Sequence, residues 1–331
     1  MLGSLADESA LLTTLRGLLA GGRYLEAAQR FEALPAAEVT ARAPFALVAA
    51  EVAGRLGRLA EAERCATAAL AAARRAAERG AEARAWNIRG AIALERGDMA
   101  AAAEYFDEAL AAARPVTAAG ITARALNNLG IVADLRGDHA AALANYELAL
   151  AAYQQAGETT GVVETHHNIG ITRRHLGDYA GALAAADQAL RLATDVGNDS
   201  LAAQALLGRA ETHLGQGDVG LAAAEVARAR AQYERLDHPV GLAEALRLEA
   251  AVAAASAALP RAAELLGEAA ALAEHHGSAH TLAEITRDLA SVRERLGDAA
   301  GAQDARLRAA QLYRKLGAAH LAARLEAPPT P

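Results

Sequence analysis

The chain has 331 residues, a formal net charge of −7 and a hydrophobic fraction of 53%, much of it alanine. The negative balance argues against nucleic acid as the main ligand, because binding a phosphate backbone needs clustered positive charge, and here arginine and glutamate alternate. The single cysteine, Cys65, excludes internal disulfides and fits a reducing compartment.

Two further absences bear on where the protein works. The longest apolar run, residues 250–260, is too short to span a bilayer. Residues 1–20 lack a basic start and contain Asp7 and Glu8, so they do not read as a signal peptide. Arginine far outnumbers lysine, as in chains from GC-rich genomes. We therefore expect a cytoplasmic, bacterial protein with no membrane segment.

A repeat with a period of forty residues runs along the chain. Gly-Asp pairs mark it at 97–98, 137–138, 177–178, 217–218 and 297–298, while Gly57-Arg58 and Ala257-Ala258 stand at the two other marker places. Each repeat has a small residue seven places before the marker and alanines five and twelve places after its first residue. A fixed period in this range indicates a stacked array of structural repeats.

Each period predicts a helical hairpin. Residues 123–136 form the pattern of one helix and residues 140–155 that of a second, with Gly137 suited to a left-handed turn and Asp138 to capping the next helix. The first repeat is offset, since Gly22 lies thirty-five residues before Gly57. We expect eight hairpins and a short terminal helix over 320–326, while the proline-rich tail, 327–331, should be disordered.

The pattern resembles the tetratricopeptide repeat. Trp86, Leu126 and Leu206 fill that family's early aromatic or aliphatic place, and Phe106 and Tyr146 fill the aromatic place of the second helix. The period exceeds the family's usual thirty-four residues, and LNNLG at 126–130 and HNIG at 167–170 are similar to the variant found in kinesin light chain and in C-terminal sensor regions of bacterial transcriptional activators.

The resemblance covers about residues 8–317. It implies an all-α fold: a right-handed superhelical α-solenoid of stacked antiparallel helix pairs, forming a single solenoid over 1–326. The expected repeats are about 8–41, 42–82, 83–121, 122–160, 161–200, 201–240, 241–280 and 281–317, with a cap at 318–326. Ala186 and Arg306 replace the aromatic residue, and Pro260 interrupts a marker, so repeats six to eight are the poorer candidates for a binding site.

Four asparagines gather at the places that face the concave groove in this family: Asn87, Asn127, Asn128 and Asn168. Asparagine is a weak helix former, and its carboxamide can hold the backbone of an extended peptide. The resemblance implies that this cluster binds a peptide. The alternative is an inter-repeat ladder in which the asparagines bond one another and neighbouring backbone.

Charged residues are expected to frame the same patch. Arg84 and Arg124 lie one turn before the asparagines, Asp134 and Arg174 lie one turn after, and His167 stands beside Asn168. Arginines suit an acidic side chain or a terminal carboxylate, so the expected ligand is a peptide segment with some negative charge. His167 and His175 could instead sense protons or contact ligand.

No catalytic motif is found. The chain has no phosphate-binding loop, nucleophile elbow or zinc-protease motif, and no carboxylate at ligand spacing completes a site with His275, His276 and His280. Cys65 should be a buried, inert thiol and Trp86 a core residue. We expect no enzyme activity, no cofactor and no metal.

Three function classes remain from the sequence. The first is a free-standing adaptor that binds a protein or peptide in the groove. The second is a ligand-sensing regulatory module of a transcription or signalling system, and the third is an assembly unit that self-associates into a homo-oligomer. Because no helix-turn-helix or phosphate-binding loop precedes the repeats, the adaptor is favoured.

Overall fold

The computed structural model describes residues 5–114, 118–316 and 318–326, so the tail expected to be disordered lies outside the described residues. All of its secondary-structure elements are α-helices, as expected. The eighteen helices are α1 Leu5–Ala20, α2 Tyr24–Glu32, α3 Ala36–Ala41, α4 Ala43–Arg55, α5 Leu59–Arg75, α6 Arg79–Glu95, α7 Met99–Ala113, α8 Ala119–Leu135, α9 His139–Ala156, α10 Thr159–His175, α11 Tyr179–Asp195, α12 Asp199–Gln216, α13 Val219–Arg235, α14 Pro239–Ala255, α15 Leu259–His275, α16 Ala279–Arg295, α17 Ala299–Lys315 and α18 Ala319–Glu326.

Consecutive helices pack as hairpins, and the turn chemistry is the one that the markers predict. Gly137 has a φ of +80°, in the left-handed region where glycine carries no Cβ penalty. Asp138 follows at once, and its Oδ1 accepts a hydrogen bond of 3.0 Å from the backbone N–H of Ala141. This bond satisfies a helix N-terminal donor that would otherwise lack a partner. The same cap is formed by Asp98, Asp178 and Asp298.

The two alanine columns are buried along the array. The column five residues after each marker is at most 2% exposed: Ala62, Ala102, Ala142, Ala182, Ala222, Ala262 and Ala302. The column twelve residues after is at most 1% exposed: Ala69, Ala109, Ala149, Ala189, Ala229, Ala269 and Ala309. Helix axes approach closely only where the side chains between them are small. The repeat therefore places its alanines where the helices cross.

The tyrosines at the ends of two of the second helices pack on the next hairpin. A Cβ atom on Gly161 would lie 2.3 Å from Cε1 of Tyr153, and one on Gly241 would lie 2.3 Å from Cε1 of Tyr233. Tyr153 and Tyr233 are 2% and 4% exposed. Each glycine thus leaves room for a ring from the preceding hairpin, which joins the repeats into one continuous core.

Two elements differ from the expectation. The first repeat was expected as a plain hairpin over 8–41, but after α1 and α2 the chain forms the short helix α3, entered through Pro35 with φ −60° and ψ 125°. The terminal helix α18 begins one residue earlier than expected, at Ala319. It packs on α17, where Leu316 and Ala322 join one apolar cluster.

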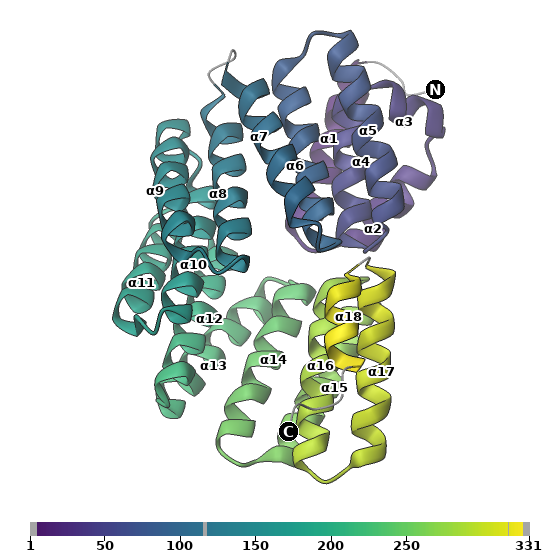
Figure 1. Ribbon diagram of the computed structural model, residues 1–331. Helices are drawn as coiled ribbons and strands as arrows, with labels where there is room; N and C mark the ends of the chain where they lie inside the picture. The colour runs from purple at the N-terminus through teal and green to yellow at the C-terminus, as the bar shows by residue number, and fades with distance from the viewer. Residues whose placement is uncertain (1–4, 115–117, 317, 327–331) are drawn as a thin grey trace.

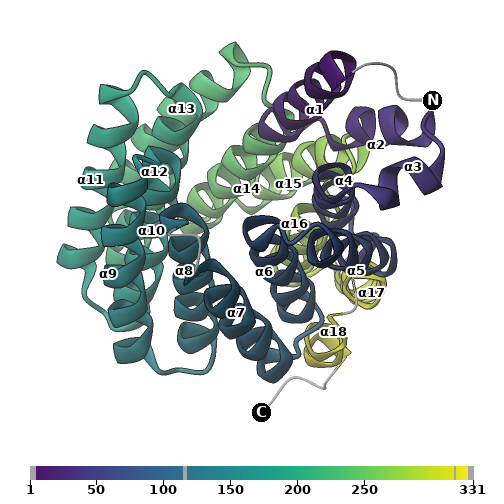
Figure 2. The same cartoon turned by 90° about the horizontal axis from the view of Figure 1, so that it is seen from above.

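The array curves so that one helix of each pair lines the inside. The members of the series α4, α6, α8, α10, α12, α14 and α16 contact their successors within the series. Seen from above, α8, α10 and α12 lie nearer the centre of the molecule, and α9, α11 and α13 lie outside (Figure 2). The first helix of each hairpin therefore supplies the concave surface.

The curvature brings the N-terminal repeats up to the C-terminal repeats (Figure 1). A Cβ on Gly57, in the turn between α4 and α5, would lie 2.6 Å from Cδ2 of Leu316. A Cβ on Gly277, between α15 and α16, would lie 2.7 Å from Cδ2 of Leu56 and 2.9 Å from Cγ of Leu25. The superhelix thus closes on itself through apolar side chains at the helix ends. Within the described residues, no helix is both long and apolar enough to cross a bilayer.

Candidate functional site

A cavity of about 450 Å³ opens on the concave side of the N-terminal repeats. It lies between α1, α4, α6 and α8, and the residues before α6 and α10 contribute to its wall. Leu19, Leu47, Val48 and Ile121 give it apolar lining. Its charged lining consists of Arg16, Glu51, Glu78, Arg84, Arg124 and Glu158.

The charges of this cavity face one another without direct pairing. Among the described residues, no carboxylate forms an ion pair with Arg16, Arg84 or Arg124. Burial raises the pKa of Glu51, and Arg124 and Arg55 only partly offset it. For Arg124, burial disfavours the charge, but Tyr153 and nearby carboxylates outweigh it and hold the pKa above its usual value. Such groups gain from a ligand that carries the opposite charges.

Two of the nine site residues predicted from the sequence, Arg84 and Arg124, line this cavity. Sequence reasoning missed Arg16 and Glu51, which come from α1 and α4, where no asparagine marks the groove. Each is a charged residue within an otherwise apolar-rich helix, and that is the only signal that the sequence offers. Only the curvature of the array shows that they face Arg84 and Arg124.

The asparagines occupy the layer where neighbouring first helices meet. Asn127 is 7% exposed, and its Oδ1 accepts a hydrogen bond of 3.1 Å from Nδ2 of Asn168 in the next repeat. This is the contact that the ladder alternative expects. Asn87 is 4% exposed, and neither atom of its carboxamide has a partner among the described residues. Asn128 is only partly buried.

The contact between neighbouring repeats that Asn127 and Asn168 form recurs elsewhere with other residue types. Asn127 and Asn168 are forty-one residues apart, and so are Arg247 and Asp288, whose Nη1 and Oδ2 lie 3.2 Å apart at the equivalent places. In between, Leu207 and Leu248 belong to one apolar cluster. At these three places, the residue three positions before the small residue of one repeat thus meets the residue two positions before the small residue of the next repeat. A peptide-binding role of the asparagines remains a prediction beside this contact.

His167 and Arg174 lie at a separate, smaller hollow. It is lined also by Gly170, Ala186 and Gly208, and its volume of about 10 Å³ is close to that of one water probe. Arg174 Nη2 is 2.8 Å from Glu211 Oε2, so this guanidinium already has a carboxylate partner. Burial lowers the pKa of His167, which favours the neutral imidazole.

The side chain of Asp134 contacts two histidines, His139 and His175, and not the asparagines. Its side chain is 8% exposed, and its oxygens lie 2.8 Å from Nδ1 of His139 and 3.1 Å from Nδ1 of His175. The nine predicted residues therefore divide among the cavity, the asparagine layer, the small hollow and this histidine pair. They do not form one framed patch, because the superhelix turns between repeats.

Other residues named from the sequence lie elsewhere. Cys65, expected to be buried, is only partly so, and burial with the neighbouring Glu61 raises the pKa of its thiol. Trp86 is half-buried and stacks on Tyr105 with ring centroids 5.4 Å apart. His280 has two carboxylates nearby, Glu95 at 3.6 Å and, four residues further along α16, Glu284 at 3.8 Å.

The family model described as tetratricopeptide repeat matches residues 81–155 and 121–195, in the stretch where the hairpins α6–α7, α8–α9 and α10–α11 stack. Residues 81–195 of this chain are tetratricopeptide repeats. Repeats of this family form protein-binding modules. No curated protein matches this chain.

Solved structures share the overall fold of this chain at low identity. A Rap protein complexed with Competence and Sporulation Factor is 14% identical, with a TM-score of 0.58 over 96% of this chain and 95% of that one. NprR in complex with its cognate peptide NprX is 13% identical, with a TM-score of 0.58 over 98% of each chain. A signal transduction ATPase with a tetratricopeptide repeat sensor from Pyrococcus horikoshii is 14% identical, with a TM-score of 0.57 over 95% of this chain and 46% of that one. At such identities the likeness shows the fold alone.

Proposed function

We propose that this chain is a non-catalytic module that holds a peptide segment of a partner protein on its concave surface. The binding site is the cavity between α1, α4, α6 and α8. The observation that carries the proposal is the set of arginines around a cavity of about 450 Å³ that form no ion pair among the described residues. A volume of this size is typical of ligand sites that bury most of a small ligand.

The lining suggests how a peptide would be held. Arg84 and Arg124 would bind a carboxylate, an acidic side chain or a chain terminus, by charge-assisted hydrogen bonds. Glu51 and Glu158 would accept hydrogen bonds from an ammonium group or from backbone N–H groups of the same segment. The apolar residues of α1 and α4 would cover its side chains, which contributes in proportion to the apolar area removed from water.

The fold neighbours support a peptide ligand in general terms. NprR was solved with a peptide, and the structural alignment with NprR covers 98% of this chain. That likeness supports a peptide site on the concave surface. The residues of the site are proposed from the lining of the cavity. The asparagines Asn127, Asn128 and Asn168 would then continue the groove beyond Arg124, with the Asn127–Asn168 bond holding its shape.

The test uses a defined probe, a library of labelled random-sequence heptapeptides, made both with a free C-terminal carboxylate and with an amidated terminus. Binders selected on the wild-type chain are titrated against the double variant Arg84→Ala, Arg124→Ala. Arg191→Ala, on the exposed side of α11, is the matched control. Each lost charged hydrogen bond is worth about 1.5–3 kcal/mol, so the double variant should bind at least about tenfold more weakly.

Two results would overturn the proposal. The first is a selected peptide that binds the double variant as tightly as it binds wild type, with equal melting temperatures. The second is the absence of any peptide that binds wild type more tightly than the double variant. A further variant, with Asn87, Asn127, Asn128 and Asn168 all replaced by alanine, tests the asparagine layer separately. If affinity falls while the melting temperature holds, the asparagines contact the peptide.

The second candidate is a ligand-sensing regulatory module, and the closed superhelix favours it. The helices that line the cavity belong to the same repeats whose turns touch Gly277 and Leu316. A ligand in the cavity would therefore shift the contact between the N-terminal and C-terminal repeats. Addition of a selected peptide should then change the radius of gyration in small-angle scattering. A radius that stays constant at saturation would rule out this coupling. Self-association stays a prediction, which light scattering over a range of concentrations would test.

A further inference from the structure

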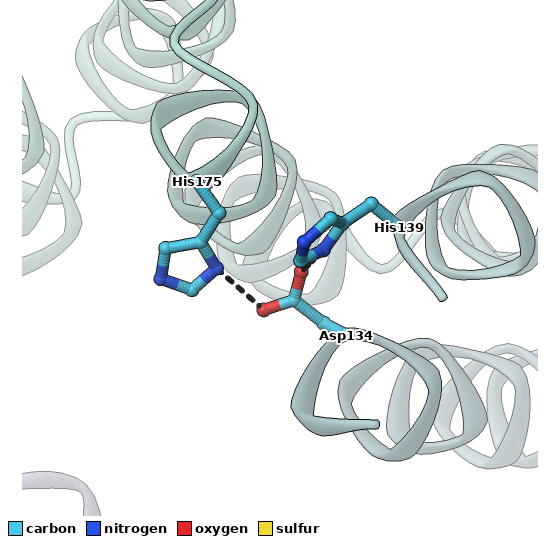
Figure 3. A group of neighbouring side chains, drawn as sticks. All are labelled: Asp134, His139 and His175. Atoms are coloured by element: carbon cyan, nitrogen blue, oxygen red, sulfur yellow. Dashed lines mark hydrogen bonds and ion pairs between the residues drawn. The ribbon is translucent and has the colours of Figure 1, made fainter. Parts of the chain in front are cut away.

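One cluster of side chains outside the cavity brings together the ligand types of a transition-metal site. Asp134 stands at the end of α8, His139 begins α9 and His175 ends α10 (Figure 3). Asp134 Oδ1 is 2.8 Å from His139 Nδ1, and Oδ2 is 3.1 Å from His175 Nδ1. One ligand atom from each of the three residues lies within 4.8 Å of the other two.

The carboxylate at the centre has no fixed cation. Asp134 is 8% exposed at its side chain, and its ionic partners among the described residues are the two imidazoles, which carry charge only when protonated. A buried carboxylate is costly unless a charge compensates it. An ion bound between the three side chains would supply that compensation. The route to it is open, because the side chain of His175 is 51% exposed and that of His139 is 26% exposed.

We propose that Asp134, His139 and His175 bind a divalent transition-metal ion of the zinc type. Two imidazole nitrogens with one carboxylate oxygen suit zinc and its neighbours, whereas magnesium and calcium prefer sets made of oxygen. Three protein ligands leave the fourth tetrahedral position to water or to a partner's side chain.

The distances need only small adjustments. Zinc binds nitrogen and oxygen ligands at about 2.0–2.2 Å, which in a tetrahedron separates neighbouring ligand atoms by roughly 3.3 Å. The Asp134 oxygen that binds the ion would move a few tenths of an ångström away from its present imidazole partner, which lies at 2.8 Å for Oδ1 with His139 and at 3.1 Å for Oδ2 with His175. The two histidine nitrogens would close from a separation of at most 4.8 Å. Rotations of exposed histidine side chains supply such shifts without moving a helix.

The place of His139 in the repeat is the signal that the sequence carried. In the other repeats, the residue two places after the first marker residue is apolar or aromatic, as with Leu59, Met99 and Leu259. His175 stands where the preceding repeat has Leu135. An ion here would tie the α8–α9 hairpin to α10, and so fix the angle between two neighbouring repeats.

The experiment titrates the full chain with ZnCl₂ by calorimetry and with CoCl₂ by visible absorption, after treatment with EDTA. Wild type should bind one ion per chain, and Co²⁺ should show the strong ligand-field bands of tetrahedral coordination. His139→Leu and His175→Leu restore residues found at the same places of other repeats, so both should fold. Each should weaken binding by about 100-fold or more, because even residues that only support a metal ligand are worth about 10–100-fold.

The matched control is His280→Gln, which removes a histidine that also lies near carboxylates, Glu95 and Glu284. It should leave the affinity and the cobalt spectrum unchanged. The proposal is overturned if wild type binds no ion stoichiometrically, or if both leucine variants, folded by their circular dichroism, keep the wild-type affinity. In that case the two histidines serve only as hydrogen-bond partners of Asp134.

Discussion

A Cβ atom placed on Gly130 would lie 2.4 Å from Cε1 of Tyr146, closer than two carbon atoms can approach. Tyr146 lies sixteen residues further along, in the second helix of the same hairpin, and is 2% exposed. Gly90 and Phe106 repeat the relationship at 2.4 Å. In the next repeat Ala186 replaces the aromatic ring, and a Cβ on Gly170 would find nothing closer than 3.6 Å. The small column is thus glycine where a ring must fit against the first helix.

This relationship predicts opposite effects of one substitution at two equivalent places. Gly130→Ala should destabilise the fold by about 1–3 kcal/mol, since the ring of Tyr146 would have to move. Gly170→Ala should be neutral or stabilise by up to about 1 kcal/mol, because alanine favours the helix and meets no clash. Urea unfolding of the two variants checks this. A loss of the same size in both would show that the ring does not set the requirement.

The bond between Asn127 and Asn168 predicts a measurable coupling between neighbouring repeats. Replacing either residue by alanine should cost about 0.5–1.5 kcal/mol, the usual net worth of a hydrogen bond, and replacing both should cost less than the sum of the single losses. A double-mutant cycle by chemical unfolding measures the coupling. Additive losses would mean that the two side chains act independently, which would contradict an inter-repeat ladder.

The contact between the ends of the superhelix predicts a change of shape when it is broken. Leu25 lies three residues after Gly22, a place where the later repeats carry exposed small residues such as Ala140 and Ala180. Leu25→Glu should separate α2 from the turn at Gly277 and increase the radius of gyration in small-angle scattering. Ala140→Glu, at the equivalent exposed place, is the control. An unchanged radius in the Leu25 variant would show that closure does not depend on this contact.

Two glutamates predict pH dependences of opposite sign. Burial raises the pKa of Glu51 above its usual value of 4.5, so the folded state binds its proton more tightly and stability falls as pH rises through the raised pKa. Burial opposes ionisation of Glu82 as well, but hydrogen bonds from Arg74 and Arg79 outweigh it and lower the pKa. The stability from Glu82 is present above pH 4.5 and is lost as pH falls through the lowered pKa.

Glu51→Gln should therefore be more stable than wild type at pH 7.5 and equal to it near pH 4. Glu82→Gln should be less stable than wild type at pH 7.5, because the variant lacks the ion pairs at 2.8 Å with Arg74 and Arg79. The difference should vanish near pH 3, because protonation of Glu82 removes the same ion pairs from wild type. Chemical unfolding across this range distinguishes the two. Differences from wild type that run parallel with pH would contradict the opposite shifts.

The sequence by itself determined the hairpins, their turns and the buried columns. Gly137 and Asp138 form the turn that their residue types predict, and the alanines at the two fixed places are buried in all seven repeats that carry them. These features depend on contacts within one repeat or between neighbours, so a period in the sequence is enough to reveal them. The extra helix α3 was missed because it breaks that period.

Tertiary structure alone decided which side chains meet across the array. Arg16 and Glu51 face Arg124 in one cavity, and Leu25 meets Gly277, although these residues lie several repeats apart. The small rotation between neighbouring repeats sets the curvature, and it accumulates over the whole stack. A sequence period fixes each hairpin but not that accumulated angle. The cavity and the closed ends therefore follow only from the superhelix as a whole.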